Sequence, residues 1–126
     1  MKTSSIFLIA VFFPAIFFAQ EFVWAKQLGG TGSQVPESII TDADGNVYTT
    51  GWFRGTVDFD PGPGIFNLPC NPEPGTDLTE NDMFISKLDA DGNFVWAKKV
   101  SGDGMQNGLF MALDTEQNLY ITGQFS

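Results

Sequence analysis

The most constraining feature of the sequence is an internal repeat. The segment 22–26, Phe-Val-Trp-Ala-Lys, returns unchanged as residues 94–98, and the similarity then continues to the end of the chain at a constant offset of 72 residues. Turn residues and aromatic residues recur together, as Gly51 does at Gly123. A repeated unit of this kind cannot bury its apolar faces alone, so several copies have to stack. The sequence therefore predicts a stacked repeat architecture, of which this chain holds fewer than two units.

Short strands separated by turns account for most of the remaining pattern. The chain has 14 glycines and 7 prolines among its 126 residues, and no window beyond the first 19 residues keeps a helical period. The strands of one unit are expected near residues 37–42, 46–53, 82–88 and 93–100. Both faces of these strands carry apolar side chains, so the sheet needs cover on each side, as a blade between neighbouring blades has. The predicted fold class is all-β, with β-propeller blades of four-stranded antiparallel sheet in an incomplete ring.

Two turns carry the same pentapeptide, Asp-Ala-Asp-Gly-Asn, at residues 42–46 and 89–93. Asp-Gly supplies the positive backbone angles of a tight hairpin, and each copy lies between apolar strands. The alternating Asp and Asn residues also suggest a calcium loop, but an EF-hand loop has its glycine at the sixth position and a distant glutamate. The second repeat keeps only a polar turn, Asp-Thr-Glu-Gln-Asn, at 114–118. The pattern favours hairpins.

A longer excursion, residues 55–81, separates the second expected strand from the third. It contains a short apolar run at 65–68, which is expected to add a hairpin to the edge of the blade. Loops carried on a rigid sheet are where such folds place function. We therefore expect partner contacts at this excursion. A glycine-rich corner at 101–104 is expected to lead into the next unit.

Residues 1–19 read as a secretory signal peptide. One lysine precedes an apolar run at residues 6–18, and a small residue, Ala19, ends it. The run is shorter than the roughly 20 residues that a membrane-spanning helix needs, although a retained anchor is the alternative. We expect cleavage after Ala19, no membrane span after cleavage, and a secreted, extracellular or cell-surface location. The predicted domains are the signal peptide, 1–19, and a β-propeller repeat region, 20–126, of about one and a half units, truncated from a longer product.

The charge and residue content exclude several classes of function. The net charge is −9, and it becomes −10 when Lys2 leaves with the signal peptide, which disfavours nucleic acid and anionic membranes as partners. Histidine is absent, so the commonest general base is missing and no ordinary hydrolase triad exists within the chain. Cys70 is the single cysteine; it can pair with a cysteine beyond residue 126, pair with another chain, or stay a thiol. No catalytic residue is predicted.

Carboxylates that flank the excursion are weak candidates for a calcium site. The best candidates are Asp58, Asp60 and Asp82, with Asp77 and Glu80 nearby, because Ca²⁺ favours several oxygen ligands. The structural alternatives are that Asp82 satisfies backbone donors at a strand start, and that Asp58 and Asp60 lie on an exposed edge strand and oppose edge-to-edge pairing. No cofactor is predicted, and calcium is kept as a weak candidate.

Trp52 is a candidate ligand contact. Together with Phe53 it is placed on a loop near the excursion, where an aromatic ring can stack on a sugar. The alternative is packing between blades, which is favoured because Phe125 repeats at the Phe53 position. Trp24 and Trp96, from the repeated segment, are likewise read as packing residues between blades.

In order and spacing, the motifs resemble the bacterial β-propeller repeat called SBBP. Residues 87–98 read Lys-Leu-Asp-Ala-Asp-Gly-Asn-Phe-Val-Trp-Ala-Lys, the strand, hairpin and strand of that family. Earlier in the chain, Val-Asp-Phe-Asp-Pro-Gly at 57–62 follows the Tyr-x-Thr-Gly of residues 48–51. The resemblance implies a propeller fold in a large secreted or surface protein, with no catalytic residues to carry over. The expected function is a non-enzymatic scaffold that contacts an unidentified protein or glycan. The alternatives are a quinoprotein-like (PQQ-type) propeller enzyme, suggested by Leu-Asp-Ala and Trp within 88–96, and a calcium-binding propeller.

Overall fold

The computed structural model of the protein describes residues 21–70 and 80–125. Within these ranges the chain forms strands and turns without a helix, which confirms the all-β prediction. The strands are β1 (Gly29–Gly30), β2 (Ser33–Thr41), β3 (Val47–Arg54), β4 (Thr56–Asp58), β5 (Asn67–Pro69), β6 (Asp82–Leu88), β7 (Phe94–Val100), β8 (Gln106–Leu113) and β9 (Leu119–Phe125). They form three sheets, in the orders β1-β4-β5, β2-β3-β6-β7 and β8-β9. The predicted signal peptide lies outside the described residues.

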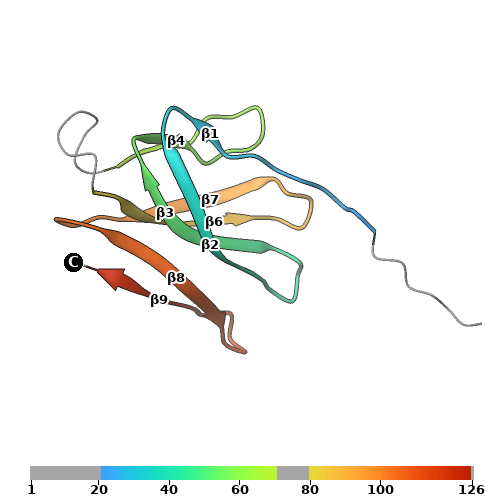
Figure 1. Ribbon diagram of the computed structural model, residues 1–126. Coiled ribbons are helices and arrows are strands. Elements are labelled where there is room, and N and C mark those ends of the chain that lie inside the picture. The colour runs from blue at the N-terminus through green and yellow to red at the C-terminus, as the bar shows by residue number, and fades with distance from the viewer. Residues whose placement is uncertain (1–20, 71–79, 126) are drawn as a thin grey trace, which may run out of the picture.

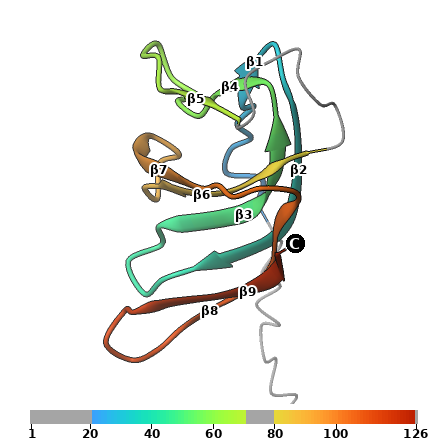
Figure 2. The same cartoon turned by 90° about the vertical axis from the view of Figure 1, so that its left-hand side faces the viewer.

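The central element is the four-stranded sheet, in which every neighbouring pair is antiparallel (Figures 1 and 2). Its strands coincide with the four expected ones, except that β2 begins earlier, at Ser33. Side chains alternate between the two faces along each strand. Thr50 of β3 and its partner Ile85 of β6 define one face, here called the Thr50 face. Gly51 and its partner Phe84 define the opposite one, the Phe84 face.

The second repeat supplies the hairpin β8–β9, which corresponds to β2–β3 of the first repeat. The register of β2–β3 shifts between Pro36 and Ser38, and that of β8–β9 shifts between Gly108 and Phe110. These positions differ by the repeat offset, so the two hairpins carry the same β-bulge. A conserved bulge position within one chain shows that local sequence, and not the neighbouring sheet, sets the strand register.

The bulge also explains why glycine recurs opposite it. A Cβ added to Gly51 would collide with the carbonyl oxygen of Val35, and one added to Gly123 would collide with that of Asn107. Val35 and Asn107 occupy the same repeat position. The bulged strand bends toward its partner, and only glycine leaves room for that approach.

The hairpin β8–β9 packs on the Thr50 face of the four-stranded sheet. Gly108 lies against that face: an added Cβ there would collide with Oγ1 of Thr50 and would lie 2.8 Å from Sδ of Met83. In Figure 2 the hairpin lies alongside β2 and β3 as a separate layer. The Thr50 face is therefore covered by the next repeat, as the two-sided apolar pattern predicts.

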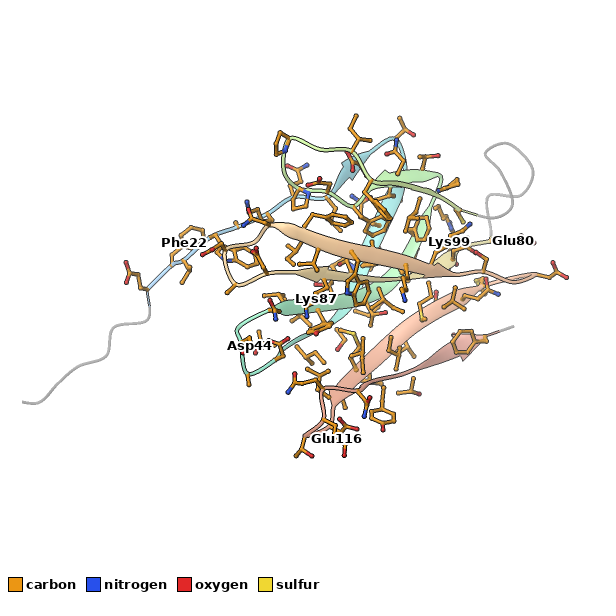
Figure 3. The ribbon with its side chains drawn as sticks, turned by 180° about the vertical axis from the view of Figure 1, so that it is seen from behind. Phe22, Asp44, Glu80, Lys87, Lys99 and Glu116 are labelled. Atoms are coloured by element: carbon orange, nitrogen blue, oxygen red, sulfur yellow. The ribbon has the colours of Figure 1, made fainter. Side chains whose placement is uncertain are left out.

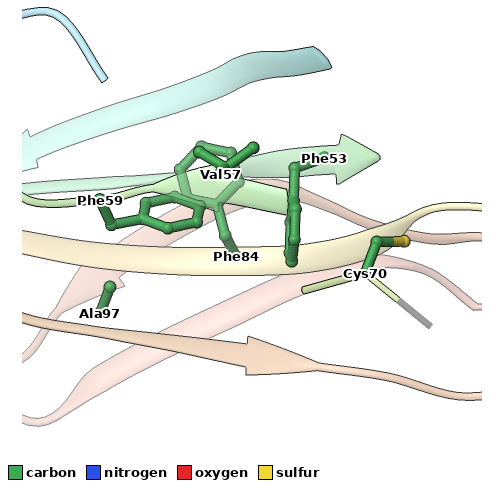
Figure 4. Close-up of a cluster of buried hydrophobic side chains, with 6 residues drawn as sticks. All are labelled: Phe53, Val57, Phe59, Cys70, Phe84 and Ala97. Atoms are coloured by element: carbon green, nitrogen blue, oxygen red, sulfur yellow. The ribbon is translucent and has the colours of Figure 1, made fainter. Parts of the chain in front are cut away.

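The excursion packs on the other side, over part of the Phe84 face. Its strands β4 and β5 join β1 in a separate three-stranded sheet. Phe59 contacts Phe53 and Phe84, with ring centroids 5.5 and 5.1 Å apart, and all three side chains are fully buried (Figure 4). The excursion does form the expected hairpin, β4–β5, but its expected place at the blade edge is wrong: the hairpin lies in a separate sheet, and the apolar residues of the excursion cover one end of the Phe84 face.

The first repeated segment does not form a strand. Residues 21–28, which carry the first Phe-Val-Trp-Ala-Lys copy, lie outside the strands, whereas the second copy forms β7 and pairs with β6. The reason is the partner: a strand equivalent to β6 precedes the second copy but no described strand stands beside the first. An extended segment becomes a strand only when another backbone satisfies its N–H and C=O groups.

Candidate functional site

The turns that join β2 to β3, β6 to β7 and β8 to β9 share one hydrogen-bonding arrangement. In the first turn, Oδ1 of Asp42 accepts the backbone N–H groups of Asp44 and Asn46, at 3.1 and 2.9 Å, and Oδ2 accepts the amide of Asn46 at 2.8 Å. Asp89 with Asn93, and Asp114 with Asn118, repeat this arrangement. The Asp at the first position and the Asn at the fifth therefore make the hydrogen bonds that stabilise the turn. These are the two residues of the pentapeptide that 114–118 retains.

The backbone of these turns differs from the two-residue hairpin that Asp-Gly suggests. A hydrogen bond from the N–H of Gly45 to the carbonyl of Asp42 closes a four-residue turn, and only Gly45 has a positive φ, 81°. Gly92 has φ 77°, and Gln117 occupies the same position with φ 66°. The left-handed residue is thus required by the turn itself, and Gln117 adopts it at a steric cost that glycine does not bear.

Hydrogen bonds within the turn hold the pKa of Asp42 at about 2, mainly through the Asn46 side chain. Nζ of Lys87 lies 3.5 Å from Oδ2 of Asp42 and 4.8 Å from the centroid of the Tyr48 ring. The hydroxyl of Tyr48 donates to the same carboxylate oxygen at 3.2 Å. The carboxylates of these turns therefore bind their own hairpins, which supports the hairpin interpretation over the calcium loop.

The proposed calcium candidates do not form one cluster. Asp58 accepts the N–H groups of Asp60 and Phe66 at 3.0 and 2.8 Å, and Asp60 accepts that of Gly62 at 2.7 Å, so both shape the loop that follows β4. The expectation that the two alternate on one edge strand is wrong: β4 lies between β1 and β5 and ends at Asp58.

The third candidate, Asp82, is fully buried at the start of β6. Its Oδ2 accepts hydrogen bonds from Oγ of Ser101 at 2.8 Å and Nζ of Lys99 at 3.2 Å, and the same ammonium group donates to the Pro69 carbonyl at 2.6 Å. This network ties the end of the excursion to β6 and β7. In the described ranges no group of three or more acidic or cysteine side chains is arranged to hold a metal ion; Asp77 lies outside them.

Cys70 follows β5 and is only 4% exposed. Burial, and next the Asp82 carboxylate, raise the pKa of its thiol. Its backbone N–H donates to the carbonyl of Gly55 at 2.7 Å, which closes the base of the excursion. A buried thiol of raised pKa is a poor nucleophile, and its position disfavours a disulfide with another chain.

Trp52 and Phe53 lie in strand β3, so their placement on a loop is wrong. Phe53 is fully buried in the core. Trp52 is half-buried and shares the side of β3 that carries Thr50, and the guanidinium of Arg54 lies 5.3 Å from its ring centroid. The cation occupies one face of the indole, which leaves less of that ring for stacking on a sugar.

The repeated tryptophans have different surroundings. Trp24 donates from Nε1 to the carbonyl of Ala90 at 2.9 Å, so the first repeated segment is fixed to the β6–β7 hairpin of the following unit. Trp96 instead meets Tyr48 edge-on within the four-stranded sheet, with ring centroids 6.2 Å apart. Contact between units is therefore observed for Trp24.

A groove of about 580 Å³ opens between residues 24–28 and the uncovered part of the Phe84 face. Its lining is mainly apolar and includes Leu28, Ile39, Val47 and Leu88. Sequence reasoning missed this surface. The residue that could have indicated it is Ile39, which is apolar and lies on a face that the excursion is too short to cover entirely. Ile39 is 67% exposed.

Charged side chains lie at both ends of the strands. Figure 3 shows Asp44 and Glu116 at the tips of their hairpins, and Glu80 and Lys99 at the opposite end. The tip of the loop between β4 and β5 also lies at the hairpin end, where Phe66 contacts Phe94, the first residue of β7.

Comparison with known proteins agrees with this geometry. Residues 23–52 match the model of a family described as the β-propeller repeat, SBBP. The chain carries a β-propeller repeat of this family. It is also 31% identical, over 106 residues, to an uncharacterized WD repeat-containing protein, L264, of Acanthamoeba polyphaga mimivirus. The match covers 82% of this chain and 7% of the viral protein, and no solved structure matches the chain.

The β-propeller repeat identifies which strands belong to which blade. The sheet β2-β3-β6-β7 is a blade, β8–β9 begins the next blade, and together they are part of a propeller scaffold. Within 21–70 and 80–125 no helix has the length and apolar character needed to cross a bilayer.

Proposed function

We propose that this β-propeller chain is a non-enzymatic, secreted or cell-surface scaffold that binds another protein through the loop between β4 and β5. The observation that carries the proposal is the exposed side chain of Ile65, 76% accessible, on a loop whose backbone is held by Asp58 and Asp60. An apolar residue presented on a rigid loop is typical of a protein contact.

The packing beside Ile65 supports this role. The ring of Phe66 lies 4.8 Å from that of Phe94, which fixes the loop to the blade. The N–H of Phe59 donates to the carbonyl of Phe66 at 3.0 Å and closes the loop at its base. Because these contacts order the loop in advance, binding through it costs little conformational entropy. A glycan partner is less favoured, since Arg54 covers one face of Trp52.

A photoreactive amino acid at position 65 tests this proposal in cells that produce the protein. We expect cross-links to one extracellular protein, and their loss when Phe66 is changed to Ser, which releases the loop from the blade. The matched control carries the photoreactive residue at Val95, an exposed apolar position on β7 (47% accessible). Equal cross-linking from both positions, or binding to a glycan array that Trp52→Ala abolishes, would contradict the loop assignment.

The secreted location has its own test. Mass spectrometry of the protein from the culture medium or cell surface should identify a chain that begins at Gln20. A protein that retains residues 1–19 and stays inside the cell would contradict secretion while leaving the binding loop unaffected.

A further inference from the structure

An aspartate is followed directly by glycine at three places in the chain: Asp44–Gly45, Asp91–Gly92 and Asp103–Gly104. The carboxyl carbon of an aspartate can be attacked by the backbone nitrogen of the next residue, and glycine, which has no Cβ, leaves that nitrogen most accessible. The attack requires that the nitrogen is not committed to a hydrogen bond and that the backbone around it can turn. The structure separates the three sites by this criterion.

The first two sites lie in closed hairpin turns. The N–H of Gly45 donates to the carbonyl of Asp42 at 3.1 Å, and the N–H of Asp44 donates to Oδ1 of the same residue, also at 3.1 Å. The second turn repeats both bonds, each at 3.0 Å, with Asp89 as the acceptor. Attack on either aspartate therefore requires that its turn opens first.

The third site lies in the glycine-rich corner between β7 and β8, where residues 101–105 are outside the strands. The side chain of Asp103 is exposed. Within 21–70 and 80–125, no hydrogen bond has the N–H of Gly104 as its donor. The carboxyl group and the nitrogen that attacks it are thus neighbours along the chain, and no turn holds them apart.

The first repeat lacks this combination. Thr31 occupies the repeat position of Asp103, and a threonine side chain has no carboxyl group. The next residue, Gly32, donates its N–H to the carbonyl of Thr56 at 3.1 Å. The exposed pair is therefore particular to the corner of the second repeat.

We propose that Asp103–Gly104 is a site of spontaneous backbone modification, at which the aspartate isomerises to isoaspartate. The nitrogen of Gly104 forms a bond to the side-chain carboxyl carbon of Asp103, and the amide proton and the carboxyl hydroxyl leave together as one water molecule. A second water then breaks the bond between this nitrogen and the main-chain carbonyl carbon of Asp103, so that the chain continues through the side-chain carbons. Nothing is oxidised or reduced, and the product has the original mass.

The modification changes the joint between the two repeats. The main-chain carbonyl of Asp103, which accepts a hydrogen bond from Nε2 of Gln106 at 3.3 Å, becomes a free carboxylate. The main chain also gains one carbon–carbon bond, about 1.5 Å long. The N–H of Gln106 donates to the carbonyl of Asn81 at 2.9 Å, and this bond fixes the start of β8 beside the blade. The isoaspartyl chain is therefore expected to hold β8–β9 less tightly, whether or not the loop at Ile65 binds a partner.

The test uses the full chain, incubated at neutral pH and constant temperature and then digested. Chromatography separates isoaspartyl from aspartyl peptides of equal mass, and electron-transfer fragmentation identifies them. We expect the initial rate at Asp103 to exceed the rates at Asp44 and Asp91 at least fivefold. In concentrated urea, where the turns are open, the three rates should agree within twofold. Equal rates in the folded chain, or a ratio that urea leaves unchanged, would overturn the inference.

Two substitutions separate the effect of the turn from that of the sequence. Asp103→Thr introduces the residue of the first repeat and should abolish the modification at this corner. Asp42→Ala removes the carboxylate that accepts the N–H of Asp44 and should raise the rate there at least threefold. Asp91, in the intact second turn of the same variant, is the matched control and should keep its rate. A rate at Asp44 that Asp42→Ala leaves unchanged would contradict protection by the turn, and the comparison in urea does not depend on this variant.

The effect on the joint is measured on the isoaspartyl chain after its separation from the unmodified chain. Amide exchange in β8 and β9 should be at least fivefold faster in the isoaspartyl chain, because local opening of this hairpin costs less free energy. The amides of β3 and β6 should keep their rates. Equal exchange of β8 and β9 in the two forms would overturn the proposed loosening.

Discussion

The hairpins β2–β3 and β8–β9 have closely related sequences and the same local geometry, yet their side chains differ in burial. Phe53 is 0% exposed and its repeat equivalent Phe125 is 57% exposed. Tyr48 is 6% exposed, and Tyr120, which makes the same hydrogen bond to its turn aspartate, is 59% exposed. The difference teaches that the repeat encodes the hairpin locally, and that the stability of each copy depends on the strands and excursion that surround it.

The largest expected difference concerns the repeated phenylalanine. Phe53→Ala should lower the free energy of unfolding by about 3–5 kcal/mol, because it leaves a cavity beside Phe59 and Phe84. Phe125→Ala should change it by less than about 0.5 kcal/mol, as exposed substitutions do. Urea unfolding of both variants measures the contrast. Equal losses would show that Phe125 is buried in solution and would remove the distinction between the copies.

A smaller effect is expected at the glycine opposite the bulge. Gly51→Ala and Gly123→Ala should each cost about 1–3 kcal/mol, since a methyl group at either position meets the partner strand's carbonyl oxygen. Gly51→Ala should appear in global unfolding. Gly123→Ala should instead speed amide exchange in β8 and β9 alone. Alanine tolerated at position 123 but not at 51 would show that the four-stranded sheet, and not the bulge, imposes the glycine.

At the turn position with positive φ, two substitutions are expected to change hairpin stability in opposite directions. Gln117→Gly should stabilise the β8–β9 hairpin by about 1 kcal/mol, because glycine adopts the left-handed conformation without steric cost. Gly45→Gln should destabilise β2–β3 by a similar amount. Amide exchange in each hairpin is the measurement. A Gln117→Gly variant that exchanges faster would contradict the strained turn.

The ionised carboxylate of Asp42 makes the stability of the fold depend on pH. The pKa of Asp42 in the folded chain is about 2, below its usual value of 3.8, so the ionised carboxylate stabilises the fold above about pH 4, and this contribution disappears as the pH falls toward 2. Asp42→Asn should remove that part of the acid dependence. The pKa of Asp114 is lowered by the same bonds, mainly from the Asn118 side chain. Carbon-13 titration of both carboxyl groups checks this, and an ordinary pKa at either would show that its turn is open in solution.

Sequence reasoning predicted the blade well. It located β3, β6 and β7 within one residue at each end, because alternating apolar residues bounded by turn residues are a local signal. It misjudged the excursion, whose Val57 and Phe59 are fully buried over the Phe84 face. Their burial depends on packing against Phe84, which lies 25 or more residues further along the chain. No local periodicity of the sequence indicates such a contact.

The candidate sites were predictable only in part. The turn aspartates were recognised as hairpin residues, but the bonds that distinguish Asp42 from Asp44 required the folded turn. Trp52 was placed on a loop because the glycines around it suggest a break, whereas Gly51 is a strand residue required by the bulge. The groove beside 24–28 had no sequence signature, since its floor and its wall come from distant segments.

The sequence by itself determined the repeat, the all-β class, the hairpin turns and the bulge with its glycine. These features depend on hydrogen bonds and close contacts between residues near one another in a hairpin, and so they recur wherever the residues recur. Only the tertiary structure decided that one Phe-Val-Trp-Ala-Lys segment is a strand and the other is not, and that Phe53 is buried while Phe125 is exposed. Strand pairing and burial require a second surface, and a repeated sequence does not specify which of its copies has one.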